Sequence, residues 1–164
     1  MAFPFNVRVY GALIYRGHLL LSDEVYGGRA FTKLPGGGLE FGEGLKDALK
    51  REFFEELRLN VRVTDHLYTT DFFQPSAFNP DHQVISVYYR VAPLPEPPFS
   101  TAAVQSEGGQ EEVELPRLLT AENSRQQLRW VLLAALTADH FTFPIDKKMV
   151  PTLRGQADVR RRAT

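Results

Sequence analysis

The segment from Leu34 to Leu57, LPGGGLEFGEGLKDALKREFFEEL, is the feature that most constrains the fold of this chain. Pro35 and the three glycines after it end a short apolar run. From about Gly44 onward, apolar residues recur at helical spacing. The segment therefore predicts a short strand, a glycine-rich loop and an amphipathic helix, in that order.

Glutamates in this predicted helix continue its apolar stripe instead of lying opposite it. At about 100° per residue, Glu52 and Glu56 fall within about 20° of Leu45, and Glu55 lies about 80° away. A structural helix keeps its carboxylates on the solvated face, because crowded, desolvated carboxylates have raised pKa values and destabilise the fold without a cation. Arg51 lies one turn before Glu55 and is expected to pair with it. The pattern favours a functional site; the alternative is a solvated acidic turn.

The glycines before the helix favour a metal site built from oxygen ligands. Gly36, Gly37 and Gly38 allow a positive φ and a close approach of the backbone to a ligand. Glu40 and Glu43 add two carboxylates before the helix begins. Carbonyl and carboxylate oxygens suit Mg²⁺ or Mn²⁺, and such ions take substrate phosphate oxygens as further ligands.

Hydrophobic patterning outside this segment predicts a mixed sheet. Two β-rich runs joined by Arg16-Gly17 predict a hairpin, and two later runs flank a Pro-containing loop; the four runs span residues 6–15, 18–25, 61–73 and 82–92. A short strand or turn is expected within 111–119, and residues 126–136 are ambiguous between strand and helix. Strands on both sides of a central helix predict an α/β sandwich around a mixed sheet.

Length and composition indicate one globular domain, which we place in residues 1–155. The chain has 164 residues, of which 43% are hydrophobic and 24% charged, as in proteins with one substantial core. A predicted final helix begins at Pro144, and Pro151 shortens or kinks it. Residues 156–164 are expected to form a disordered basic tail. The Pro-, Ser- and Gly-rich stretch 93–110 is expected to be a mobile surface excursion, which either covers a pocket or contributes to a homodimer.

Charge and composition also exclude several classes of function. The net charge of −1 gives no electrostatic basis for a nucleic-acid or membrane partner. No apolar run reaches about 18 residues, so no membrane span is predicted, and the N-terminal residues lack the pattern of a signal peptide. The absence of cysteine excludes a disulfide framework and a cysteine metal site. A cytoplasmic location is expected.

The glycine-glutamate segment resembles the signature of the Nudix hydrolases. That signature reads Gly, five residues, Glu, seven residues, then Arg-Glu-apolar-any-Glu-Glu-any-Gly-apolar. Here Gly37 and Glu43 are followed by Arg51-Glu52-Phe53-Phe54-Glu55-Glu56-Leu57-Arg58-Leu59. Arg58 stands where the family usually has the glycine that ends the helix, so the departure concerns the helix terminus more than the chemistry. The resemblance implies a Nudix-type α/β/α sandwich.

The resemblance also implies an activity and a set of site residues. Nudix enzymes use divalent cations to hydrolyse the pyrophosphate of a nucleoside diphosphate linked to another group, such as an ADP-ribose-like compound, a nucleotide sugar or a nucleoside triphosphate. Glu52, Glu55 and Glu56 would be the catalytic carboxylates and Mg²⁺ or Mn²⁺ ligands. The remaining roles would fall to the Gly36 carbonyl as a metal ligand, to Arg51 as a partner of the carboxylates, and to Glu43 as a support of the loop or an outer metal.

The general base and the substrate contacts lie outside the motif. Glu122 is the preferred base, with Glu111, Glu112, Glu114 and the helix glutamates as alternatives; any of them can instead be a solvated surface charge. Candidate substrate contacts are the loop glycines, two cations before the loop, an aromatic residue and a histidine at a strand start, namely Gly37, Gly38, Arg29, Lys33, Phe73 and His82. Other aromatics able to stack on a base are Tyr26, Phe31, Phe72 and Phe78, although most such residues belong to the core.

A second class of function is a Nudix-like domain that binds a nucleotide without cleaving it. Such sensor domains often lack one or more motif glutamates, whereas this chain keeps all three. An enzyme is therefore favoured over a sensor. The expected partner is a nucleoside diphosphate-type small molecule, and the substrate itself is left open.

Overall fold

The computed structural model describes residues 4–94, 100–118, 120 and 125–161. A mixed sheet forms its centre, with five strands in the order β3-β2-β1-β6-β5. Their bounds are β1 Phe5–Tyr15, β2 His18–Tyr26, β3 Arg29–Lys33, β5 Asn60–Thr69 and β6 Gln83–Leu94. Two further strands, β4 Gly36–Gly38 and β9 Gln127–Leu132, pair with β1 and β2 respectively. β1 and β6 run parallel, and the other pairs in this sheet are antiparallel.

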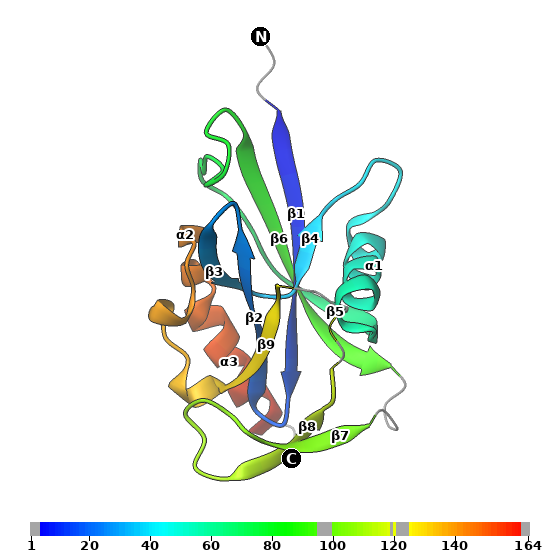
Figure 1. The fold of residues 1–164 in the computed structure, drawn as a ribbon, viewed down its shortest axis with the longest axis vertical. Helices are drawn as coiled ribbons and strands as arrows, with labels where there is room; N and C mark the ends of the chain where they lie inside the picture. Colours follow the sequence, from blue (N-terminus) through cyan, green and yellow to red (C-terminus); the bar gives the residue numbers. More distant parts are fainter. Residues whose placement is uncertain (1–3, 95–99, 119, 121–124, 162–164) are drawn as a thin grey trace.

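Helices cover both faces of the sheet, so the predicted α/β/α sandwich is confirmed (Figure 1). Helix α1, Leu45–Leu57, packs on one face, and α2, Pro144–Lys148, and α3, Val150–Arg161, lie on the other. Strand β1 supplies both cores by alternation. Val9 and Leu13 point toward α1, whereas Ala12 and Ile14 belong to the core beneath α2 and α3. Among the described residues, no helix is long and apolar enough to cross a membrane.

The predicted β1–β2 hairpin is confirmed, and its turn lies at the expected place. Arg16 and Gly17 both have positive φ angles, 48° and 76°, as a two-residue hairpin turn requires. Ile14 pairs with Leu19, and Tyr15 pairs with His18. The turn therefore fixes the register that sends Leu19 and Leu21 to one core and Leu20 to the other.

Helix α1 ends at Leu57 even though the next residue is not glycine. Arg58 adopts the left-handed conformation, with φ 52° and ψ 33°, and its amide bonds back to the carbonyls of Phe53 and Phe54. Its guanidinium lies 5.7 Å from the centre of the Phe54 ring. A non-glycine residue carries a conformational cost in this region. Arg58 nevertheless adopts it, so the helix ends where the glycine of the motif would end it.

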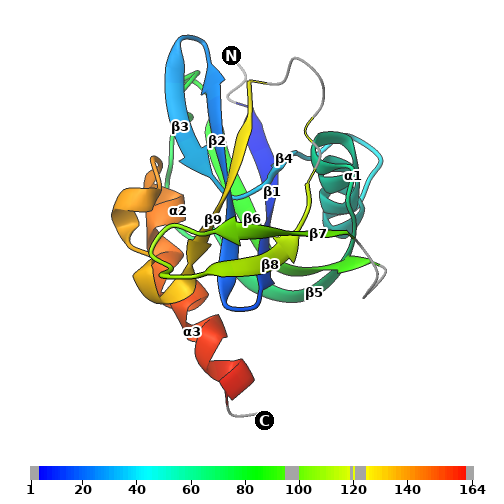
Figure 2. The same cartoon turned by 60° about the horizontal axis from the view of Figure 1, so that its bottom comes forward.

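Part of the stretch 93–110, for which the sequence predicts a mobile surface excursion, forms a paired strand. Strand β7, Thr101–Gln105, pairs with β8, Glu112–Pro116, and this hairpin crosses one end of the main sheet (Figure 2). Leu115 of β8 is fully buried in the core beneath α1. The pairing of β7 with β8 and the burial of Leu115 hold this segment on the domain, although its composition offers few apolar side chains. Residues 95–99 lie outside the described part of the chain.

The C-terminal third also resolves two ambiguous predictions. Residues 126–136 contain β9 followed by a short 3-10 helix, Leu133–Ala135, and a second short 3-10 helix spans Ala138–His140. The final helix is divided into α2 and α3, and Pro151 occupies the first turn of α3, where its missing N–H has no consequence. α3 continues to Arg161 and thus includes residues 156–161, for which the sequence predicts a disordered tail.

Candidate active site

The glycine run forms strand β4 instead of the predicted loop, and it brings the backbone close to α1. Gly37 pairs with Val9 of β1. Gly36 has a φ of 145°, and a β-carbon there would lie 2.1 Å from the Val9 carbonyl oxygen. A β-carbon on Gly37 would lie 2.4 Å from Oε1 of Glu52. The glycines therefore allow β4 to lie close to β1 at Gly36 and close to the Glu52 side chain of α1 at Gly37.

Arg51 connects β4, the loop after it and α1. Its guanidinium bonds to both carboxylate oxygens of Glu43, at 2.6 and 3.0 Å, and donates to the Gly38 carbonyl at 3.1 Å. The contact with Glu52 is also 3.1 Å, and the predicted contact with Glu55 is longer, at 3.4 Å. The hydrogen bonds from Arg51 lower the pKa of Glu43 to about 2. Arg51 therefore anchors the loop chiefly through Glu43, and Glu55 is a secondary partner.

The three motif glutamates differ in their surroundings. Glu55 faces solvent, with 57% of its side chain exposed, whereas only 13% of the Glu52 side chain is exposed. Burial raises the pKa of Glu56 to about 7; Glu52 and Glu24 add to the rise, and Lys33 and Gln126 oppose it. The predicted rise in pKa is thus confirmed for Glu56. Glu52 and Glu56 form the inward pair, and Glu55 lies at its outer edge.

Glu24 is a member of this cluster that sequence reasoning missed. It lies on β2 and accepts a hydrogen bond from Ser22 at 2.9 Å. The Gln126 amide nitrogen lies 3.4 Å from Glu24 and 3.5 Å from Glu56, so it links the two carboxylates. Residue spacing along the sequence gives no sign of this, because Glu24 and Glu56 come from elements far apart in the chain.

Lys33, a predicted phosphate contact, is buried among protein oxygens. Its side chain is only 4% exposed, and its ammonium lies 2.9 Å from Glu24 and 3.1 Å from the Gly36 carbonyl oxygen. It also lies 5.4 Å from the centre of the Tyr10 ring. Burial lowers the pKa of Lys33, but Tyr10, Glu24 and Glu56 together raise it above its usual value. Lys33 is therefore charged in this cluster.

A pocket of about 440 Å³ adjoins the carboxylate cluster, and Glu24 and Lys33 line its wall. Four aromatic side chains enclose another part, namely Tyr26, Phe31, Phe78 and Phe143. Phe31 lies 5.3 Å from Phe143 and 5.5 Å from Phe78, measured between ring centres. Polar groups between them come from Asn6, Asn79, His82 and Ser86. The volume and the mixture of aromatic and polar groups are typical of small-molecule sites.

Asp146 places a buried carboxylate on the wall of this pocket, and sequence reasoning missed it. It is 3% exposed and accepts a 2.5 Å hydrogen bond from the Tyr88 hydroxyl. Burial raises the pKa of Asp146 to about 6, although the Tyr88 hydrogen bond, Lys33 and Arg8 act in the opposite direction. An aspartate in the first turn of a helix is common because it interacts favourably with the helix dipole. The sequence alone therefore gives no reason to assign Asp146 to a pocket.

Other predicted site residues are spread over several places. His82 lines the pocket, as expected of a substrate contact, whereas Phe73 is 70% exposed and does not line it. Arg29 donates to the Ala77 carbonyl at 2.9 Å and lies 5.6 Å from the Phe78 ring centre, so it supports the pocket from outside.

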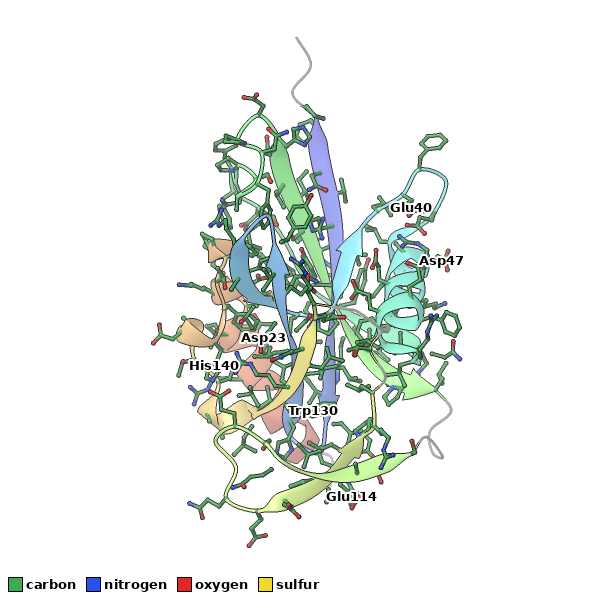
Figure 3. The ribbon with its side chains drawn as sticks, in the orientation of Figure 1. Asp23, Glu40, Asp47, Glu114, Trp130 and His140 are labelled. Atoms are coloured by element: carbon green, nitrogen blue, oxygen red, sulfur yellow. The ribbon has the colours of Figure 1, made fainter. Side chains whose placement is uncertain are left out.

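The preferred general base, Glu122, lies outside the described residues. Of its alternatives, Glu111 is exposed next to β8, and Glu112 and Glu114 belong to β8 itself. Glu114 accepts a hydrogen bond from Thr101 at 2.6 Å. In Figure 3 it lies well apart from Glu40, along the longest axis of the molecule. Because Glu114 belongs to the β7–β8 hairpin, it lies away from the loop that leads into α1.

The donor atoms of the cluster fit a hard divalent cation. Carboxylates of Glu24, Glu52 and Glu56 and the Gly36 carbonyl are oxygen donors of the kind that Mg²⁺ and Mn²⁺ prefer. The Lys33 ammonium already lies against Glu24 and the Gly36 carbonyl, so these oxygens accept positive charge. Within the described part of the chain, no three carboxylate or histidine side chains converge at metal-ligand spacing. The donors are of the right chemistry but are not assembled.

A comparison with known families decides the classification. The sequence model of the NUDIX domain matches residues 5–153. The chain belongs to the Nudix hydrolase family. The family assignment predicted from the Gly37–Leu59 motif is therefore confirmed, and so is the expectation of a Nudix enzyme as a class. No curated protein matches the chain in sequence.

Solved structures share this Nudix fold at low sequence identity. A MutT protein from Methanosarcina mazei Go1 has a TM-score of 0.64 at 18% identity, covering 94% of this chain and 96% of that one. A NUDIX hydrolase from Nitrosomonas europaea has a TM-score of 0.63 at 16% identity, with coverages of 93% and 90%. An ADP-ribose pyrophosphatase from Streptococcus suis 89-1591 has a TM-score of 0.54 at 17% identity, with coverages of 93% and 91%. These likenesses show the fold.

Proposed function

We propose that this Nudix protein is a Mg²⁺- or Mn²⁺-dependent hydrolase that cleaves the pyrophosphate bond of a nucleoside diphosphate linked to another group. The observation that carries the proposal is the continuity of the pocket with the carboxylate cluster. Glu24 lines the pocket and, through Gln126, also lies next to Glu56 on the motif helix. A ligand in the pocket therefore extends directly toward the motif carboxylates.

Glu52, Glu56 and the Gly36 carbonyl are the proposed metal ligands, with Glu24 as an additional donor and Glu55 at the solvent side. A divalent cation held there would neutralise diphosphate charge and polarise a water. Arg51 and Glu43 hold β4 and α1 together, so they position the ligands. Their partly buried, bidentate contact restricts the movement of Glu52 relative to the Gly36–Gly38 backbone.

The aromatic end of the pocket is the proposed site for the nucleobase. Phe31, Phe78 and Phe143 offer ring faces and edges for stacking. Asn79 and His82 offer polar groups to the edges of a base.

Arg8 is the proposed phosphate contact, and it was missed in the sequence. Arg8 lines the pocket and donates to the Tyr10 hydroxyl at 2.6 Å. One of its nitrogens lies 3.8 Å from the position of a β-carbon on Gly38. It thus lies between the aromatic end and β4, where a diphosphate that joins the two ends would pass.

The general base stays a proposal with candidates from two parts of the chain. Glu122 is the candidate from the sequence. The glutamates of the motif helix are the candidates from the described residues, because they lie where a metal-bound water would be activated. A homodimer and a cytoplasmic location also stay as expectations from the sequence.

A binding module without turnover is the competing function. A panel of diphosphate compounds with and without Mg²⁺ distinguishes the two, measured as release of phosphate or nucleoside monophosphate. The panel includes ADP-ribose, a nucleotide sugar, a dinucleoside polyphosphate, and normal and oxidised nucleoside triphosphates. The proposal expects turnover of at least one compound that EDTA abolishes and Mg²⁺ or Mn²⁺ restores. Binding of these compounds without any turnover would favour the sensor, and full activity in EDTA would refute the metal mechanism.

A further inference from the structure

Lys33 occupies the place in the cluster where positive charge is most needed. The residue ends β3, three positions before the first residue of the glycine strand β4, and its side chain is 4% exposed. The ammonium contacts two groups named above as metal donors, Glu24 at 2.9 Å and the Gly36 carbonyl at 3.1 Å. A buried ammonium on a backbone carbonyl and a carboxylate is arranged as a bound cation would be.

The surroundings of Lys33 are strongly acidic. Gln126 lies 3.4 Å from Glu24 and 3.5 Å from Glu56, and Glu52 lies one turn before Glu56 on the same helix. Arg51 is engaged with Glu43 as well as Glu52. Arg8 acts on Glu24 and Glu52 through its charge, and within the described residues the Lys33 ammonium forms the direct ion pair with Glu24. Without it, buried carboxylates would lie close together uncompensated, which is costly.

We propose that Lys33 is the resident counter-cation of the metal-free site, and that a divalent cation competes with its ammonium for the Gly36 carbonyl and Glu24. The inference rests on the proposed function, since it concerns the same metal site. Lys33 also lines the pocket. When its ammonium leaves the Gly36 carbonyl, it stays on the pocket wall beside Tyr10. Lys33 is therefore a residue that sets metal affinity, and not only an ion-pair partner.

The competing explanation is an ordinary buried ion pair that only stabilises the strands. The two explanations differ in metal affinity. If the ammonium competes, its removal frees two oxygen donors and removes a like charge, so divalent cations bind more tightly. If the pair is only structural, its removal leaves metal affinity unchanged or disturbs the donors and weakens it.

Binding of Mn²⁺ to the full chain without substrate, followed by the electron paramagnetic resonance signal of free Mn²⁺ and by calorimetry, tests the proposal. Lys33→Met keeps the apolar stem and removes the charge, and Lys33→Arg keeps the charge. We expect Lys33→Met to bind Mn²⁺ at least tenfold more tightly than wild type, and Lys33→Arg to stay within about threefold. Without metal, Lys33→Met melts at a lower temperature, and Mn²⁺ raises its melting temperature more than that of wild type.

Two further variants keep the test decisive. Lys50 is an exposed lysine of α1, 3.9 Å from Asp47, so Lys50→Met makes the same change in net charge away from the cluster and should alter Mn²⁺ affinity by less than about twofold. Lys33→Gln replaces Lys33→Met if the latter fails to fold, and the same tightening is expected.

The outcomes separate this inference from the proposed function. Equal or weaker Mn²⁺ binding by the neutral Lys33 variants, with wild type binding and hydrolysing normally, overturns the role of Lys33 and leaves the enzyme in place. A wild-type protein that binds no Mn²⁺ at millimolar concentration overturns both.

Discussion

Gly37 and Glu52 are in direct contact: a β-carbon on Gly37 would lie 2.4 Å from Oε1 and 2.5 Å from Cδ of Glu52. The blocked atoms belong to the end of a flexible side chain, so the side chain can move while the backbone stays. Strand β4 and helix α1 therefore meet at a point where we expect a substitution to affect the position of Glu52 more than the stability of the fold.

Replacing Gly37 by alanine should displace the Glu52 carboxylate. We expect turnover to fall by about 10²-fold, because a shift of about 1 Å in a positioned group has effects of this size, while the free energy of unfolding changes by about 1 kcal/mol or less. Steady-state kinetics and thermal unfolding measure the two. Gly44→Ala is the matched control, since its β-carbon would lie 3.6 Å from Asp47, an ordinary contact. Equal effects of both substitutions on turnover would refute the explanation.

Replacing Glu56 by glutamine should reduce turnover and stabilise the metal-free protein. The amide keeps the shape but removes a charged ligand, and we expect kcat to fall by about 10²- to 10⁴-fold. The pKa of Glu56 is raised to about 7, so the folded wild type loses stability as pH rises from about 4.5 to 7 and does not regain it above. In EDTA, the melting temperature of Glu56→Gln should therefore exceed that of wild type by more at pH 8 than at pH 5. A constant difference between the two pH values contradicts the raised pKa.

Replacing Arg51 by lysine keeps the positive charge but removes the planar guanidinium, so it tests whether the geometry of the Arg51 hydrogen bonds is needed. An ammonium cannot bond to both Glu43 oxygens and to Gly38 and Glu52 at the same time. We expect a loss of about 1–3 kcal/mol in unfolding free energy and lower kcat, measured by denaturant unfolding and kinetics. Glu43→Gln is the companion variant, because it weakens the same contact from the other side. If Arg51→Lys is as stable and active as wild type, the bidentate contact has no structural role.

Replacing Asp146 by asparagine should change the pH dependence of stability in a lower window. The pKa of Asp146 is raised to about 6 from an ordinary value of 3.8, so its ionisation costs stability as pH rises from about 4 to 6. Asparagine still accepts the hydrogen bond from Tyr88 and removes this cost. The variant should gain melting temperature relative to wild type between pH 4 and 6, with no further gain above pH 7. A gain that first appears above pH 7 would point to another group.

Helix α1 could be predicted from the sequence because its pattern is local. Burial of Leu49 and Phe53 and the inward position of Glu52 and Glu56 follow from spacings of three and four residues. Arg51 was placed one turn from Glu55 for the same reason. Its stronger contact with Glu43 depends on how the preceding loop folds back, and spacing within a helix cannot show that.

The rest of the site depends on strand register, which the sequence does not display. Glu24 reaches Glu56 only because β2 lies between β1 and β9 and because Ser22 and Glu24 share a face of β2. A shift of one residue in pairing would turn Glu24 to the other face. Asp146 likewise reaches the pocket only through the packing of α2 on the sheet, and Arg8 only through the pairing of β1 with β4 and β6. The glycine run was predicted as a loop, since three glycines carry no strand propensity and pair with β1 only by fitting beside Val9.

The pocket has two parts, one lined by paired strands and the other by connecting segments, and these differ in how readily they accept substitutions. Its charged end is built from β1, β2 and β3, which carry Arg8, Glu24 and Lys33 and whose backbones are paired in the sheet. Its aromatic end comes largely from the connection at residues 74–79 and the start of α2 at 143–146. Connections of this kind accept insertions and substitutions far more readily than paired strands do. Changes in these two short segments can therefore reshape the aromatic end while the paired strands around Glu24 and Lys33 keep their positions.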